Sequence, residues 1–126
     1  VNPEGGSAAF LICDHASNRI PRRLGTLGLG EAERDDHIAW DPGAADMARR
    51  LCELLDAPLV LSGYSRLVID CNRPLGNRQL TAAVSGGVTV PGNASVSPWD
   101  RQARIEELHR PYHDTIARLL DARRHR

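Results

Sequence analysis

Apolar residues fall into runs along the chain that predict buried strands. Residues 8–14 (AAFLICD) are apolar at nearly every position, as in a strand whose sheet is covered on both faces. Residues 59–65 and 66–72 form two further apolar runs rich in aliphatic and β-branched side chains. We expect a strand in each of these three segments.

Apolar residues also repeat at helical spacing. Residues 31–40 predict a short helix, and residues 41–57 predict a stronger one, with Asp41 as N-cap, Pro42 at the first helical position and an apolar stripe from Ala44 to Leu55. Residues 99–126 predict a long helix that Pro111 should kink or split. Residues 73–98 are rich in Gly, Pro, Asn, Ser and Thr and are too long for a plain connection, so we expect a functional or mobile loop there.

This order of elements predicts an α/β fold. We expect a single domain over residues 1–126, a layered α/β/α sandwich with a mixed, mainly parallel sheet. A chain of 126 residues is long enough to bury a core. Three strands and a terminal helix make a thin sheet, so we expect the sandwich to be incomplete.

Composition excludes several classes of protein. The 16 basic and 16 acidic residues balance, which argues against a nucleic acid partner and against a charged membrane surface. No apolar run approaches the roughly 18 residues of a membrane span, and the first residues lack the pattern of a signal peptide. The three cysteines have no CxxC spacing and predict neither a disulfide framework nor a thiolate zinc site. We expect a cytoplasmic protein.

Chemistry-bearing residues follow the first predicted strand. Asp14 and His15 stand where that strand ends, a position at which ligand sites gather in α/β sheets. His15 suits a metal ligand or a general base, and Asn18 stands close enough in sequence to approach the same point, although an amide is a poor zinc ligand. The alternative is that Asp14 and His15 only hydrogen-bond the turn while Asn18 and Arg19 are solvated.

A second group surrounds the strand predicted at residues 66–72. Asn72 and Arg73 offer amide and guanidinium donors, the chemistry that holds a carboxylate, and Arg66 is a further candidate. Asp70 either supports this site or forms a structural ion pair with Arg66 or Arg73.

The remaining histidines give weaker signals. His37 and Asp41 are four residues apart, with Asp41 explained as an N-cap and His37 left open. His109 and His113 have the spacing of two ligands on one helical face, but the Glu of the metalloprotease pattern is missing between them. Solvated or helix-end histidines are the interpretation that we favour.

Together these segments resemble the N-formylglutamate amidohydrolase family. The resemblance rests on CDHASNRIP (13–21), HIAWDPGA (37–44), YSRLVIDCNRP (64–74) and RIEELHRPYH (104–113), which occur in the family's order and cover most of the chain. It implies a fold similar to zinc-dependent carboxypeptidases and aspartoacylases (the zinc-exopeptidase, phosphorylase/hydrolase-like type).

The resemblance also implies an activity and a set of site residues. The expected activity is metal-dependent hydrolysis of an N-formyl or similar N-acyl group from glutamate or a related acidic amino acid, in histidine degradation, with zinc as the expected cofactor. The expected metal residues are His15 and, in the place of the family's Glu, Asn18. The substrate-binding residues are Arg66, Asn72 and Arg73; Asp14 and His37 are candidate catalytic groups, and Asp41 and Asp70 are structural neighbours.

Family members are longer, and their second half should carry another metal ligand and a catalytic glutamate. The chain therefore resembles the N-terminal half of a member, or a truncated one. Two alternatives follow: a non-catalytic domain that binds a small acid, or an inactive fragment of the same fold. We expect a small N-acyl amino acid as partner and leave a homo-oligomer open.

Overall fold

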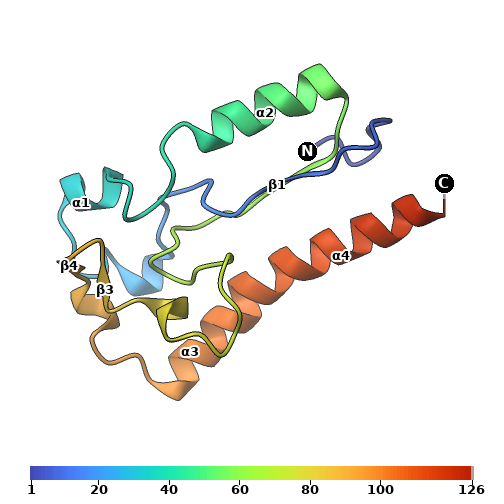
Figure 1. Cartoon of the computed structure of the whole chain (residues 1–126). Coiled ribbons are helices and arrows are strands. Elements are labelled where there is room, and N and C mark those ends of the chain that lie inside the picture. Colours follow the sequence, from blue (N-terminus) through green and yellow to red (C-terminus); the bar gives the residue numbers. More distant parts are fainter. Residues whose placement is uncertain (126) are drawn as a thin grey trace.

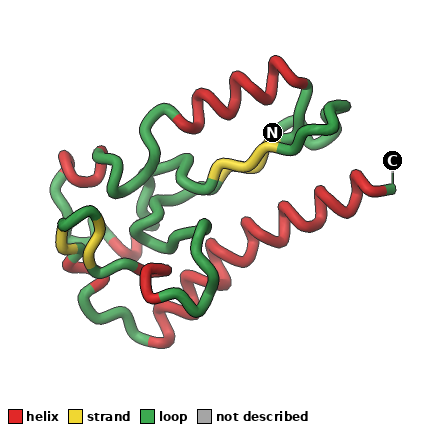
Figure 2. Tube along the Cα trace, viewed as in Figure 1, coloured by secondary structure: helices red, strands yellow, loops and turns green. Residues whose placement is uncertain are grey.

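The computed structural model describes residues 1–125 as an α/β arrangement. Its strands are short, and Figure 2 shows how much of the chain is loop and turn. The strands and α-helices are β1 (Leu11–Cys13), α1 (Glu31–Asp35), α2 (Ala44–Leu55), β2 (Leu59–Leu61), β3 (Val84–Ser85), β4 (Val88–Thr89), α3 (Pro98–Arg104) and α4 (Arg110–Arg124). Short 3-10 helices span Arg22–Leu24, Pro91–Asn93 and Arg78–Thr81, and a π-helical turn spans Ile105–His109.

The centre of the fold is the parallel pair β1 and β2. Leu11 pairs with Leu59 and Cys13 with Leu61, and α2 makes the crossover between the two strands. Helix α2 contacts both strands and α4 contacts β2. In Figure 1 the strands run between α2 and α4. The predicted α/β class and the parallel pairing are confirmed.

The strand predicted at residues 66–72 is wrong. Residues Leu67, Val68 and Ile69 are buried as an apolar run should be, but Leu67 and Val68 form a turn and Ile69 is irregular. Their backbone bonds are local or irregular, with the Val68 amide donating to Ser65 and the Asp70 amide to Leu80. The apolar run correctly indicated burial, and this burial comes from loop residues around Leu67 and Val68 and from Ile105 of the π-helical turn beside Ile69. The strands predicted at 8–14 and 59–65 exist but are shorter than their apolar runs.

The helices begin and end differently from the prediction. The helix predicted at 31–40 stops at Asp35, and the one predicted at 41–57 starts at Ala44. Its N-cap is Gly43, whose φ of 84° lies in the left-handed region, so Asp41 is not the N-cap. The predicted break near Pro111 is confirmed, because the π-helical turn directly precedes α4.

The segment predicted as a mobile or functional loop, residues 73–98, is folded onto the core. Strands β3 and β4 form an antiparallel hairpin there, and Gly86 and Gly87 at its turn both have positive φ. Leu80 and Val90 are fully buried. Val90 belongs to the main apolar cluster, with Leu27, Leu29, Ile38, Ala39, Leu67 and Val68.

A buried arginine ties this segment to the helices. Arg104 is 1% exposed and donates to the Val68 carbonyl, to Asn93 Oδ1 and to Asp100 Oδ2. Asn93 in turn donates to the carbonyls of Leu67 and Ala82. This network fixes the backbone just before Asp70, where the candidate site begins.

Candidate functional site

Two polar residues, Asp14 and His15, directly follow β1 and contact different partners. His15 lies between two carboxylates: its Nε2 is 2.7 Å from Asp70 Oδ1 and its Nδ1 is 3.3 Å from Asp41 Oδ2. His15 and Asp70 are buried, whereas the Asp41 side chain is 54% exposed. Of the predicted cluster of Asp14, His15 and Asn18 at the carboxyl end of the first strand, His15 lies instead with Asp70 and Asp41.

Charge and hydrogen bonding stabilise the ionised forms of the buried pair. The hydrogen bond with Asp70 raises the pKa of His15, although burial works against this. Burial pushes the pKa of Asp70 upward, but the hydrogen bonds from His15 and the Asn72 amide, with the His15 and Arg66 charges, outweigh it and lower the pKa. Asp70 is thus a carboxylate that orients the His15 ring.

Arginines complete the surroundings of Asp70. Arg66 Nη2 is 3.3 Å and Arg73 Nε is 3.8 Å from Asp70 Oδ2. The alternative of an Asp70 ion pair with these arginines is therefore realised, and it does not remove Arg73 from the surface, since its side chain is 42% exposed. One carboxylate orients both the imidazole and the guanidinium.

Asp14 lies in a hollow of about 390 Å³ that is also lined by Asn72 and Arg73, two of the three predicted substrate-binding residues. Its Oδ1 accepts a hydrogen bond of 2.5 Å from the Tyr112 hydroxyl. Burial, and then Asp14, raises the pKa of Tyr112, so the phenol remains protonated. The hollow is lined by Ile12, Asp14, Cys71, Asn72, Arg73, Pro74, His109, His113 and Ile116.

Two histidines that we interpreted as solvated or helix-end residues contact the site segment instead. His109 is only 8% exposed, and its Nε2 is 3.0 Å from the Arg73 carbonyl oxygen. His113 Nε2 is 2.8 Å from the Cys71 carbonyl oxygen, and the two rings lie 4.5 Å apart. The solvated interpretation is wrong for His109. The i, i+4 spacing was the sequence signal that these two histidines act together. In the structure both contact backbone carbonyls of the Cys71–Arg73 segment.

Two predicted site residues have their hydrogen bonds elsewhere. The Asn18 amide donates to the Arg34 carbonyl and to Asp35 Oδ1. The His37 side chain is 76% exposed, with Nδ1 2.8 Å from Asp36 Oδ1. The structure thus joins His15, Asp41 and Asp70 to Arg66 and Arg73, while Asn18 and His37 have partners outside this group.

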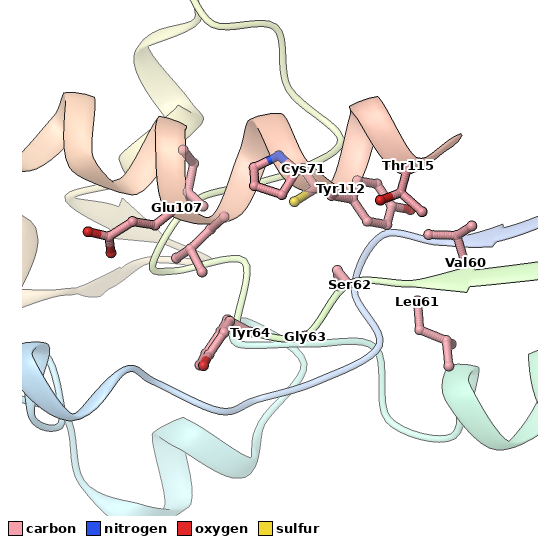
Figure 3. A pocket seen from close by; sticks show the side chains of 12 residues that line it. Val60, Leu61, Ser62, Gly63, Tyr64, Cys71, Glu107, Tyr112 and Thr115 are labelled. Carbon is pink, nitrogen blue, oxygen red and sulfur yellow. The ribbon is translucent and has the colours of Figure 1, made fainter. Parts of the chain in front are cut away.

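A second hollow, of about 290 Å³, lies between the end of β2 and the helix that carries Tyr112. Figure 3 shows Ser62, Gly63 and Tyr64 along one side and Cys71, Tyr112 and Thr115 along the other. Burial raises the pKa of Cys71 to about 12, so this thiol is not a nucleophile at neutral pH. The lining is mostly apolar, and its charged residue is the acidic Glu107. This hollow therefore lacks the cationic side chains that would bind a carboxylate ligand.

The side chains that could bind a metal are dispersed over residues 1–125. The described residues contain no group of three or more His, Cys, Asp or Glu side chains placed to hold an ion. The donors at the site are an imidazole and carboxylates, a chemistry that suits zinc. Within the same residues no helix is both long and apolar enough to cross a membrane.

Comparisons with known proteins agree on one family. The sequence model of "N-formylglutamate amidohydrolase" matches residues 7–126. An N-formylglutamate deformylase of Pseudomonas putida is 33% identical over 129 aligned positions, which cover 94% of this chain and 47% of that protein. The crystal structure of the Atu2144 gene product of Agrobacterium tumefaciens superposes with a TM-score of 0.96 at 39% identity, covering 98% of this chain and 49% of that one. The chain spans about half the length of these relatives. It belongs to the N-formylglutamate amidohydrolase family.

Proposed function

We propose that this chain provides the substrate-carboxylate site and part of the metal site of an amidohydrolase that removes a formyl group from N-formylglutamate or a similar N-acyl acidic amino acid. The observation that carries the proposal is the His15–Asp70 pair at the end of β1, with Arg73 bound to the same Asp70. Family membership supports the reaction class, and the site supports an acidic substrate.

The carboxylate of the substrate would bind Asn72 and Arg73. Asn72 and Arg73 line the hollow beside Asp14, and both are exposed enough to meet a ligand. Asp70 holds one edge of the Arg73 guanidinium at 3.8 Å, which leaves the Nη groups for a substrate. Fixing the carboxylate would orient the amide of the substrate for reaction.

A divalent metal, with zinc as the expected ion, would be held at His15. When bound, such an ion polarises the amide carbonyl and activates water. In the overall reaction the oxygen of water would join the formyl carbon, the C–N bond would break, and a proton from that water would pass to the nitrogen, which gives formate and the free amino acid. The roles of this chain are to orient His15 through Asp70, to bind the substrate carboxylate and to keep Asp14 hydrogen-bonded by Tyr112.

A test is formate release from N-formylglutamate by the purified chain. The variant Arg73→Ala should raise KM by about tenfold or more, because a charge-assisted hydrogen bond is worth roughly 1.5–3 kcal/mol. Arg78→Ala, an exposed arginine in the same segment, is the matched control and should leave KM unchanged. An unaltered KM in Arg73→Ala removes this residue from carboxylate binding.

Binding of a small acid without turnover is a second candidate function. It is favoured because residues 1–125 contain no group of three metal-ligand side chains. In that case N-formylglutamate should raise the melting temperature of the chain, Arg73→Ala should abolish the rise, and no formate should form.

Several finer points stay predictions that accompany this proposal. They are the zinc-exopeptidase type of layering, a cytoplasmic location, a place in histidine degradation and a homo-oligomeric state. Roles for Asp14 and His37 as catalytic groups also stay predictions.

A further inference from the structure

His15 has two ring nitrogens, and their surroundings differ. Nε2 faces Asp70, whose side chain is only 5% exposed and which also accepts from the Asn72 amide and pairs with Arg66. Nδ1 faces Asp41, whose side chain is 54% exposed. An ion at Nε2 would have to disrupt a buried charge pair, whereas Nδ1 lies on the open side.

The arrangement at Nε2 is the one that metal-ligating histidines use on their far nitrogen. A carboxylate bound to that nitrogen fixes the tautomer and the ring orientation and increases the basicity of the other nitrogen. Asp70 at 2.7 Å fills this position. The nitrogen directed toward a metal is then Nδ1, and the nearest carboxylate to it belongs to Asp41.

The distance between His15 Nδ1 and Asp41 Oδ2 is that of a hydrogen bond when no ion is bound, and it also equals the separation of two ligands of one ion. Donor atoms about 2.0–2.1 Å from a tetrahedral zinc lie about 3.3 Å apart. The observed separation is 3.3 Å.

The backbone holds these two donors together. The Asp41 amide donates to the His15 carbonyl at 3.0 Å, and the Ala44 amide donates to the Asp41 carbonyl at 3.0 Å. Gly43, in the left-handed region, starts α2 two residues later and so frees the Asp41 side chain from capping the helix. These backbone bonds hold the His15 and Asp41 side chains close together in the absence of an ion.

Asn18, in contrast, has its amide nitrogen bound to the end of α1, and no hydrogen bond joins it to His15. Its Nδ2 donates to the Arg34 carbonyl at 3.1 Å and to Asp35 Oδ1 at 3.0 Å. Its local role is to fasten the turn after β1 to the end of α1. A carboxylate is also a better zinc ligand than a carboxamide.

We infer that Asp41 Oδ2, together with His15 Nδ1, ligates the divalent cation of this site, and that Asn18 does not. This inference rests on the proposed function for the presence of a metal, and it assigns the second protein ligand to the helix junction at residues 41–43. Residues outside this pair, or water, supply the remaining positions.

The experiment measures zinc affinity by competition with a chromophoric chelator, and the visible spectrum after cobalt(II) substitution. Asp41→Ala should weaken zinc binding by at least about 100-fold, the upper end of what loss of an outer partner of a ligand costs, and should change the cobalt spectrum. Asp46→Ala, which removes an exposed acid from the first turn of α2, is the matched control and should bind as wild type. Asp41→Asn tests charge at constant shape and should be intermediate.

Several outcomes would overturn the inference. These are wild-type zinc affinity in Asp41→Ala, a loss in Asn18→Ala that equals the loss in His15→Ala, or no zinc binding by the wild type. Equal circular dichroism and melting temperature in all variants exclude unfolding as the cause. The assay also separates the two proposals: zinc binding that needs Asp41 without formate release contradicts only the proposed function, whereas formate release with Asp41-independent zinc binding contradicts only the ligand assignment.

Discussion

Helix α2 and the helix pair α3–α4 are both amphipathic, yet they differ in how much of the apolar face is covered. On α2, Met47 is 68% and Leu54 is 64% exposed, and Cys52 is the buried residue. Ahead of α4, Arg104 and Ile105 are almost fully buried, and Tyr112 within α4 is 7% exposed. The periodicity of a sequence therefore identifies a face suited to burial, while the covering element decides whether burial occurs.

The difference follows from what each helix packs against. Helix α2 packs mainly against the short strands β1 and β2, and these strands leave Met47 and Leu54 exposed. The α3–α4 side meets the folded segment at residues 73–98, whose Leu80 packs with Ile69 and Ile105. Matched substitutions in the two regions should thus have very different effects on stability.

The largest difference in stability should appear when a buried leucine and an exposed leucine are each replaced by alanine. Leu67→Ala removes a side chain that is 1% exposed in the main apolar cluster and should lower the free energy of unfolding by about 2–5 kcal/mol. Leu54→Ala makes the same chemical change on the exposed face of α2 and should cost within about 0.5 kcal/mol. Urea titration of both variants checks this. Equal costs would mean that the α2 stripe is covered in solution.

A smaller effect should come from the start of α2. Gly43→Ala forces an L side chain into the left-handed region and should cost about 1–2 kcal/mol, although no atom lies within 4 Å of the added methyl. Gly76→Ala also enters open space, but at a φ outside that region, and should be near neutral. Thermal unfolding of the two variants shows whether backbone strain, rather than steric crowding, causes the loss of stability. An unchanged melting temperature in Gly43→Ala would contradict the expected strain at the start of α2.

The smallest effect should be a pH dependence on the α3 side. Burial pushes the pKa of Asp100 upward, but hydrogen bonds from Arg23 and Arg104 outweigh it, so the pKa lies below its ordinary value of 3.8. A lowered pKa stabilises the folded state above pH 3.8, and this contribution is lost as the pH falls through the folded pKa. Asp100→Asn should therefore be less stable near neutral pH, with its deficit shrinking in acid. Chemical denaturation between pH 2 and pH 6 measures this, and a constant deficit argues against the linkage.

Local patterns predicted the α/β class and the parallel strands, and they directed attention to the end of β1 as the candidate site. His15 and Asp70 were candidates from sequence, and the structure places them in contact. The false strand at 66–72 arose because an apolar run reports burial, and here turns satisfy the backbone.

The Asp41 contact could not be predicted, because it joins residues 26 positions apart and Asp41 had a sufficient local explanation as an N-cap. The left-handed φ of Gly43 removes that explanation, and such a φ is a property of the folded backbone. The same holds for His109, whose partner is a backbone carbonyl 36 positions away.

The π-helical turn at Ile105–His109 has a consequence for evolution and engineering. Its closing bond runs from the Arg110 amide to the Ile105 carbonyl, one residue longer than an α-helical bond, and it comes directly before Pro111, which lacks an amide hydrogen. One residue corresponds to about 100° of rotation around the helix axis. The turn therefore rotates the side chains of α4 relative to those of α3. Ile105 can then pack with Ile69 and Leu80, while Tyr112 packs in a different cluster with Val60 and Cys71. Deleting a single residue here would rotate one helix relative to the other, so the length of this turn is as constrained as its composition.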